Sequence, residues 1–262
     1  MPITILPQKV HIGKLSVVFT WDDNLSRQID IIAPLFIEHN WRCTFYVNPG
    51  EDVFKHRYYK GYKALAEKGF EVASHGYSHK WMAEISNQER EFEFSESIKE
   101  ISKHIHHHPI TFAFPAHNSN DNVVAEAKQY HLETRNTLAN SRYFRIQSAT
   151  DIAELTNNLE VAITHGNNYV FSGHSIITET EYLNNEKGEG WQPIRVTLLS
   201  TLLNYIENSG EKIEVITFAQ ASLKEFIRKH NLFKEGKYEF NDEALTELEK
   251  VGVNAKTLNT LL

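Results

Sequence analysis

The chain has 262 residues, of which 41% are hydrophobic and 23% are charged, a composition that is typical of a folded globular protein and excludes a largely disordered one. Single barrels commonly reach this length, so one large domain is expected. The net charge of −7 gives no electrostatic reason to expect nucleic acid or an anionic membrane as a partner, and it favours neutral or cationic substrates.

The start of the chain lacks the basic segment and the apolar run of about 7–15 residues that mark a signal peptide. No later stretch approaches the roughly 18 apolar residues of a membrane-spanning helix. The sequence therefore predicts neither secretion nor membrane insertion. A cytoplasmic location is expected if the chain is complete, and an extracellular or cell-envelope location if a signal peptide has been removed.

Short apolar, β-branched or aromatic runs alternate along the chain with segments whose apolar residues recur every three or four positions. This alternation predicts an α/β fold in which helices cover a parallel sheet. About seven such units suggest a closed or nearly closed barrel. The predicted strands are 15–20, 43–47, 70–73, 110–114, 131–134, 169–171 and 213–217, and the predicted helices are 25–39, 59–68, 87–104, 122–130, 149–164 and 194–208.

Three further features complete the predicted organisation. The single cysteine, Cys43, excludes an internal disulfide and suits a buried strand position. Residues 178–191 carry turn-forming residues and too few apolar ones for a helix or strand, so a long loop over the site is expected. Beyond Phe218 we expect a charged helical tail, with helices at 221–230 and 242–251 and an extended segment at 237–240.

Two adjacent carboxylates, Asp22 and Asp23, follow the first predicted strand. The carboxyl ends of the strands form the active-site face of a parallel barrel, so both side chains would project where ligands bind. A metal ion would neutralise one carboxylate while the other stays a base. The alternative is that the Asp22–Asn24 segment caps the helix predicted from residue 25. These residues alone leave both interpretations open.

A pair of histidines four residues apart, His75 and His79, also follows a predicted strand, and neutral imidazoles at this spacing can share one cation. Among 14 histidines roughly one such pair is expected by chance. His104 and His108 form a second pair, which we interpret as a solvated helix end. The first pair lies on the face of the carboxylates, and with Asp23 it would leave open coordination positions on a metal.

Two more predicted strands are followed by a histidine, His117 and His174. A lone histidine at a strand end is more often structural than catalytic. Several of them at one barrel mouth, together with two carboxylates, point instead to an active site. His174 is therefore a candidate general acid.

These motifs resemble the polysaccharide deacetylase family, the NodB-homology enzymes of carbohydrate esterase family 4. Thr20-Trp-Asp-Asp23 is similar to the family's Thr-Phe-Asp-Asp motif, and His75-Gly-Tyr-Ser-His79 to its His-(Ser/Thr)-x-x-His motif. Cys43-Thr-Phe-Tyr-Val47 adds to the likeness, which covers roughly residues 14 to 225. The resemblance implies a deformed, TIM-like (β/α) barrel. We expect it to occupy residues 1–225, with residues 226–262 as a helical extension packed on it.

The resemblance also implies roles for individual residues. Asp22 would be the catalytic base and His174 the general acid, while Asp23, His75 and His79 would bind the metal. That metal is one divalent ion, with zinc favoured and cobalt, nickel, manganese or iron also suited to the ligands.

Residues around these motifs are predicted to contact the substrate. The backbone N–H of Ala116 would help to stabilise the oxyanion. Trp21, Tyr77, Trp81 and Trp191 lie in or near the motif loops, where exposed aromatic rings stack on sugar faces, although core packing explains each equally well. Pro115 and His117 complete the predicted substrate-contacting set, together with Trp21, Tyr77 and Trp191.

Two motifs depart from the family pattern. The third motif, Arg-x-Pro-x-Gly, reads Ala113-Phe-Pro-Ala-His117, so the arginine that holds the base is absent. Phe112-Ala-Phe-Pro115 looks like the Phe-x-Tyr-Pro version of some branches. The Asp-x-x-Asp-Trp motif, which supports the catalytic histidine, has no clear match near Thr134-Arg-Asn136, where Arg135 offers a charge. How base and acid are oriented is therefore left open.

The sequence thus predicts a metal-dependent hydrolase that removes acetyl groups from N-acetylated or O-acetylated carbohydrate and does not act on peptide bonds. A bound ion would polarise the carbonyl and lower the pKa of its water toward about 7. Asp22 would take a proton and His174 would protonate the leaving amine. One alternative is hydrolysis of a small linear or cyclic amide, and another is a weakened carbohydrate-binding protein. The sequence does not predict the oligomeric state.

Overall fold

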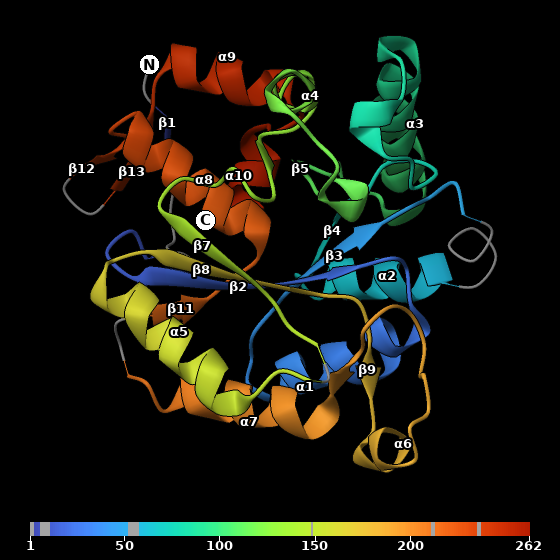
Figure 1. The fold of residues 1–262 in the computed structure, drawn as a ribbon. Helices are drawn as coiled ribbons and strands as arrows, with labels where there is room; N and C mark the ends of the chain where they lie inside the picture. The colour runs from blue at the N-terminus through green and yellow to red at the C-terminus, as the bar shows by residue number, and fades with distance from the viewer. Residues whose placement is uncertain (1–2, 6–10, 52–57, 148, 211–212, 235–236) are drawn as a thin grey trace.

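A computed structural model describes residues 3–5, 11–51, 58–147, 149–210, 213–234 and 237–262. Its centre is a parallel sheet of eight strands that curls without closing (Figure 1). In sheet order the strands are β6 (Glu133–Thr134), β5 (Thr111–Phe112), β4 (Glu71–Ser74), β3 (Thr44–Val47), β2 (Leu15–Asp22), β8 (Asn168–Gly173) and β7 (Ser141–Arg145), with β11 (Ile213–Val215) also paired to β2. Within the described residues no pairing joins β6 to β7. The deformed (β/α) barrel is therefore confirmed.

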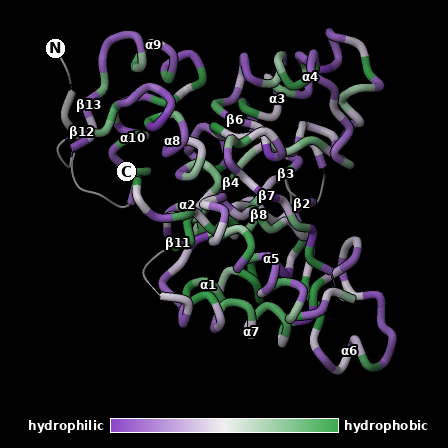
Figure 2. The backbone as a smooth tube through the Cα atoms, turned by 60° about the vertical axis from the view of Figure 1, so that its left-hand side comes forward, coloured by the Kyte–Doolittle hydropathy of each residue, from purple (hydrophilic) through white to green (hydrophobic). Residues whose placement is uncertain are grey.

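Helices cover both faces of the sheet. On one face lie α1 (Ala33–Glu38), α5 (Ile152–Thr164) and α7 (Val196–Glu207), and on the other lies α8 (Phe218–Lys229) (Figure 1). The tube of α1 and α7 is largely apolar, as expected for helices packed against a sheet (Figure 2). The remaining helices are α2 (Tyr59–Glu67), α3 (Asn87–Ile105), α4 (Asp121–Ala127), α6 (Glu179–Leu183), α9 (Asp242–Lys250) and α10 (Ala255–Leu261), with shorter turns at Gln28–Ile32, Met82–Glu84 and Pro115–His117.

The side chains of the central strand β2 point alternately to the hydrophobic core and to the inside of the curled sheet, where the site lies. Phe19 and Trp21 are fully buried in the cluster formed with α1, α5 and α7. Val18 belongs to a different cluster, on the side of α8. Because successive side chains of a strand point to opposite faces, Thr20 and Asp22 lie on the α8 side, inside the curled sheet.

Each predicted strand and helix has a counterpart in the structure, but the structure also contains short strands and a last helix, α10, that were not predicted, and other details differ. Strand β7 was not predicted, because it lacks an apolar run. Residues 178–191 are not entirely loop: Thr178 and Glu181 form a capping box that starts α6. The helix predicted from residue 25 begins with a π-helical turn at Gln28–Ile32. Cys43 is buried and free, as predicted.

The second histidine pair was only partly interpreted correctly. His104 lies near the end of α3 beside Glu100, at 3.2 Å. His108 is half-buried rather than fully solvated, because its ring packs against Gly252, where an added Cβ would lie 2.3 Å from it. Gly252 also has a φ of +80°, so a side chain there would be strained as well as crowded.

The C-terminal segment packs with α8 in one apolar cluster. Helices α9 and α10 contribute Leu248 and Leu258 to it, and β13 (Lys237–Phe240) contributes Phe240. Strand β13 also pairs with β1 (Ile3–Ile5) and with β12 (Phe233–Lys234). Helix α8 runs without a break across residue 225, so the division of the chain there stays a prediction. None of the described helices combines the length and apolarity needed to cross a membrane.

Candidate metal centre and active site

The two carboxylates at the end of β2 point into one cavity. The strand extends to Asp22, which is 4% exposed, and Asp23 ends it with a φ of +81°. The cavity has a volume of about 330 Å³. The side chains that line it come from loops after several strands: Asp22, Asp23, His75, His79, Trp81, Phe114, Ala116, His117, Arg135, Arg145, His174 and Trp191.

Asp23, His75 and His79 form the one group of potential metal ligands found among the described residues. Their ligand atoms all lie within 4.8 Å of one another. The Asp23 Oδ1 is 3.5 Å from the His75 Nε2 and 3.2 Å from the His79 Nε2. His75 Nδ1 donates a hydrogen bond to the Ala113 carbonyl at 2.7 Å, which leaves its Nε2 lone pair directed at Asp23. The predicted ligands therefore meet.

The protonation states of His75 and Asp23 suit a divalent cation, whereas the hydrogen bond with Asp23 raises the pKa of His79, so a cation there would compete with a proton for that imidazole. Burial lowers the pKa of His75 and outweighs the attraction of Asp22 and Asp23, so the imidazole is neutral near pH 7. Burial would raise the pKa of Asp23, but its hydrogen bond with His79 and the nearby His75 lower it overall, so this carboxylate is ionised. One carboxylate with imidazole nitrogens is a donor set that zinc and similar ions accept.

The base candidate Asp22 has a buried guanidinium as its partner. Arg135 donates from Nη1 to Oδ1 and from Nη2 to Oδ2 of Asp22, both at 2.6 Å, and it also reaches Thr20. Burial would raise the pKa of the Asp22 carboxyl, but the attraction of Arg135 outweighs it and holds that pKa well below its usual range. The arginine of the third motif is absent, as the sequence shows, but the expectation that Asp22 therefore lacks arginine support is wrong. The guanidinium follows β6, whereas the third motif would supply it after β5.

His174 lies on the other side of Asp23, with its Nε2 3.7 Å from Oδ2. Its ring meets the ring of Trp191 edge-on at 5.2 Å. One buried amide positions both the acid and base candidates: Gln28 Nε2 donates to the carbonyl of Asp22 at 2.5 Å and to that of His174 at 2.7 Å. Gln28 belongs to the π-helical turn, a kind of distortion that often occurs at functional sites.

The capping interpretation of residues 22–24 is wrong. The Asn24 side chain pairs with the backbone N–H and carbonyl of Asn48 rather than with a helix start. The free N–H groups of Ser26 and Arg27 are instead bound by the carboxylate of Glu189, at 2.9 and 3.0 Å. The segment that carries Trp191 is thereby fixed to the turn after Asp23.

Strained backbone is concentrated around the cavity. Positive φ values are uncommon outside glycine, and where they cluster they often mark functional sites. Half of the twelve non-glycine residues of the described chain with positive φ lie in the loops around the cavity: Asp23, Asn24, His79, Ala116, His117 and Asn136. Their side chains are held in place against an energetic cost.

The predicted substrate contacts are only partly in place. Ala116, His117 and Trp191 line the cavity. Trp21 does not, because the alternation of β2 turns it into the core, where it is 0% exposed. Tyr77 packs edge-on against Phe92 and lies outside the lining.

Other residues change the substrate-contacting set. Pro115 is buried and outside the lining of the cavity. Phe114 and Arg145 line it without having been predicted. The motif pattern placed Phe114 next to Pro115, but no signal marked Arg145, because its strand was missed.

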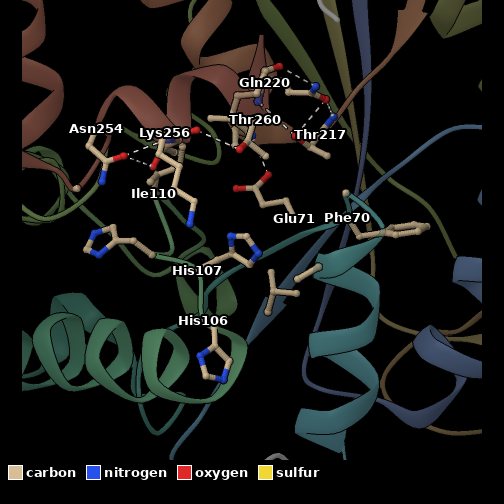
Figure 3. Close-up of a pocket in the computed structure, with 18 residues that line it drawn as sticks. Phe70, Glu71, His106, His107, Ile110, Thr217, Gln220, Asn254, Lys256 and Thr260 are labelled. Carbon is tan, nitrogen blue, oxygen red and sulfur yellow. Dashed lines mark hydrogen bonds between the residues drawn. The ribbon is translucent and has the colours of Figure 1, made fainter.

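A second cavity, of about 290 Å³, lies at the other end of β4, where Glu71 begins the strand that His75 follows (Figure 3). His106 and His107 border it across from Glu71 (Figure 3). The Glu71 carboxylate is already bound by the Thr44 hydroxyl at 2.8 Å and by the Ala219 N–H at 2.7 Å, near the start of α8. Its role is to join strand and helix, so we assign the chemistry to the first cavity.

The chain is similar to known proteins both in sequence and in fold. The model of the family described as polysaccharide deacetylase matches residues 9–134. No curated protein sequence matches the chain. Among solved structures, the chain is similar to the Xyl-CE4 domain of a multidomain xylanase from the hindgut metagenome of Trinervitermes trinervoides. The identity is 13% and the TM-score 0.58, over 84% of this chain and 93% of that one.

Two further structures share the fold. A family 4 acetyl xylan esterase from Clostridium thermocellum, in complex with cobalt, is 14% identical with a TM-score of 0.55, over 79% of this chain and 89% of that one. A mutant of a CE4 family pseudoenzyme is 16% identical with a TM-score of 0.54, over 81% and 68%. The family match over residues 9–134 and the shared fold together support a NodB-homology domain of carbohydrate esterase family 4 in this chain.

Proposed function

We propose that this protein removes acetyl groups from carbohydrate by metal-dependent hydrolysis, with Asp22 as base and His174 as acid. One observation carries the proposal: a carboxylate paired with a buried arginine lies in the same cavity as a carboxylate and two imidazoles arranged for a metal. The match to the polysaccharide deacetylase family model supports the substrate class. The similarity of the fold to an acetyl xylan esterase that was solved with cobalt is compatible with it.

Each of these residues has its own role in the proposed reaction. Asp23, His75 and His79 would hold the ion, which when bound polarises a carbonyl and makes water a better nucleophile at neutral pH. Asp22, kept ionised by Arg135, takes the proton of the attacking water.

Residues in other loops act on the leaving group and on the oxyanion. His174 protonates the leaving nitrogen or oxygen. The N–H of Ala116 donates to the oxyanion that develops at the carbonyl. All of these groups line the one cavity, where the acetyl group would bind.

Two alternatives predict different results. A small-amide hydrolase needs an enclosed pocket, whereas Trp81 and Trp191, 53% and 51% exposed, flank this cavity and suit a sugar chain. A weakened binding protein would lack support for its base, whereas Asp22 has Arg135. Both observations favour the deacetylase.

The decisive measurement is acetate release. Protein stripped with a chelator and reloaded with zinc or cobalt is expected to release acetate from N-acetylated or O-acetylated oligosaccharides, and the stripped protein is not. Small linear and cyclic amides serve as the comparison. If the small amides are turned over faster than the oligosaccharides, the protein is a small-amide hydrolase instead. If it binds oligosaccharide but releases no acetate in any metal form, it is a carbohydrate-binding protein.

We expect His75→Ala to lose the metal. Wild-type protein purified without a histidine tag should contain about one equivalent of divalent metal, and the variant close to none, because the buried Nε2 ligand is gone. Elemental analysis measures this directly. His117→Ala removes another imidazole from the same cavity and should keep the metal. A full complement in His75→Ala would refute the site.

Glu189→Gln is expected to raise KM several-fold with a smaller change in kcat. Glutamine loses the charge that binds the N–H groups of Ser26 and Arg27, at a cost of about 1 kcal/mol, and loosens the segment that carries Trp191. Steady-state kinetics separate the two constants. Glu186→Gln, in the same exposed segment, is the control. Equal KM values for Glu189→Gln and Glu186→Gln would contradict a role of Glu189 in substrate binding.

A further inference from the structure

One cation of the cavity has no counter-charge. Arg145 ends β7, lines the cavity and makes no ion pair with any residue of the described ranges, whereas Arg135 is committed to Asp22. The Arg145 guanidinium lies 4.8 Å from the centre of the Trp191 ring, so cation–π attraction holds it over the indole. A guanidinium held in this way keeps its N–H donors for a ligand.

A second donor faces the same cavity. His117 has a φ of +54°, which a histidine adopts only at a cost. The Asn136 amide Nδ2, which can only donate, lies 2.9 Å from the Nδ1 of His117, so Nδ1 accepts and the ring carries its proton on Nε2. Burial, helped by the charges of Arg135 and Arg145, lowers the pKa of His117 to about 4, so the ring stays neutral near pH 7.

The balance of charge in the cavity then points to the ligand. Asp22 and Arg135 neutralise each other, and Asp23 faces the histidines with which it would share a cation. Among the described residues Arg145 is left without an ion-pair partner, in a protein whose net charge is −7. A guanidinium and a neutral N–H donor that line the same cavity suit the two oxygens of a carboxylate.

We propose that Arg145 and His117 bind a carboxylate carried by the acetylated sugar substrate, so that the protein prefers acidic glycans to neutral ones. This inference rests on the proposed deacetylation. It reverses the expectation of neutral or cationic substrates, because that expectation used the net charge of the whole chain, whereas recognition depends on the local charge in the cavity.

The test compares matched acetylated oligosaccharides. One set carries a uronic acid carboxylate at C6, a second carries a carboxylate on an ether at O3, and the neutral set has the carboxylate reduced to an alcohol. Wild-type kcat/KM is expected to be at least about tenfold higher for one acidic set than for its neutral counterpart, and the ratio should fall as ionic strength rises. The preferred set identifies the position of the carboxylate.

Variants test whether Arg145 causes the preference for acidic oligosaccharides. Arg145→Gln should bring the acidic-to-neutral ratio close to one, and Arg145→Lys should restore part of it, because lysine keeps the charge but not the planar fork. Arg142→Gln, on the same strand and outside the cavity, should keep the wild-type ratio. A wild-type ratio near one for both acidic sets, or an unchanged ratio in Arg145→Gln, would overturn the inference.

Failure of this inference is distinguishable from failure of the deacetylase assignment. Equilibrium titration of the same oligosaccharides into wild-type and Arg145→Gln protein reports carboxylate binding without turnover. If no oligosaccharide releases acetate but the acidic set binds more tightly to the wild type, only the assigned reaction fails. If acetate is released from all sets equally and binding does not distinguish them, the reaction stands and carboxylate recognition is wrong.

Discussion

Replacing Arg135 with methionine is expected to destabilise the metal-free protein by about 3–5 kcal/mol. The substitution leaves the Asp22 carboxylate 4% exposed, without the guanidinium that donates to both of its oxygens. Denaturant unfolding monitored by fluorescence measures the change. Arg135→Lys should recover part of the loss. The double variant Arg135→Met with Asp22→Asn should recover most of it, because no buried charge is left unpaired.

The deficit of Arg135→Met should shrink in acid. In the wild type the folded pKa of Asp22 lies below the unfolded value, so the stability from the pair is fully present above the unfolded pKa and is lost only as pH falls toward the folded one. Without Arg135, burial leaves the folded pKa of Asp22 above the unfolded value, so protonation at low pH relieves the cost. A small stability deficit in Arg135→Met would show that the Asp22–Arg135 pair contributes little. A deficit that does not change with pH would show that it does not arise from the ionised Asp22 carboxylate.

The second large effect is expected from Asp22→Asn. An amide is nearly isosteric with the carboxylate but cannot take a proton, so kcat should fall by about 10²–10⁴-fold. The metal content should stay near that of the wild type, because Asp22 is not among the three grouped ligands. Acetate release and elemental analysis on the same samples separate catalysis from metal loss.

The matched comparison is Asp23→Asn, which should lose metal and activity together. Because Asp22→Asn leaves Arg135 without its partner, circular dichroism should first show that the variant is folded. Undiminished turnover in a folded Asp22→Asn protein would remove Asp22 as the base.

The metal group and the fold were predictable because their signals are local. Apolar runs followed by Asp23 or His75 identify both a strand and the end of the barrel that it faces. The same reasoning could have corrected Trp21: it is one residue before Asp22 on an alternating strand, so the two cannot face the same side.

The partner of Asp22 was not predictable in this way. Arg135 lies 113 residues from it in the sequence, and only the closeness of β6 to β2 across the curled sheet brings the two together. Strand β7, which ends in Arg145, is polar and at the edge of the sheet, so no periodic apolar signal revealed it. Contacts of this kind depend on tertiary geometry rather than on spacing along the chain.

The guanidinium beside Asp22 also bears on how such proteins are classified. The motif of the resemblance would place an arginine at residue 113, after β5, where this chain has alanine, whereas Arg135 reaches Asp22 from the end of the adjacent strand β6. A classification that reads the third motif alone would miss the charged partner of this carboxylate. Functional classification should therefore ask which charge reaches the carboxylate in space, whichever motif supplies it.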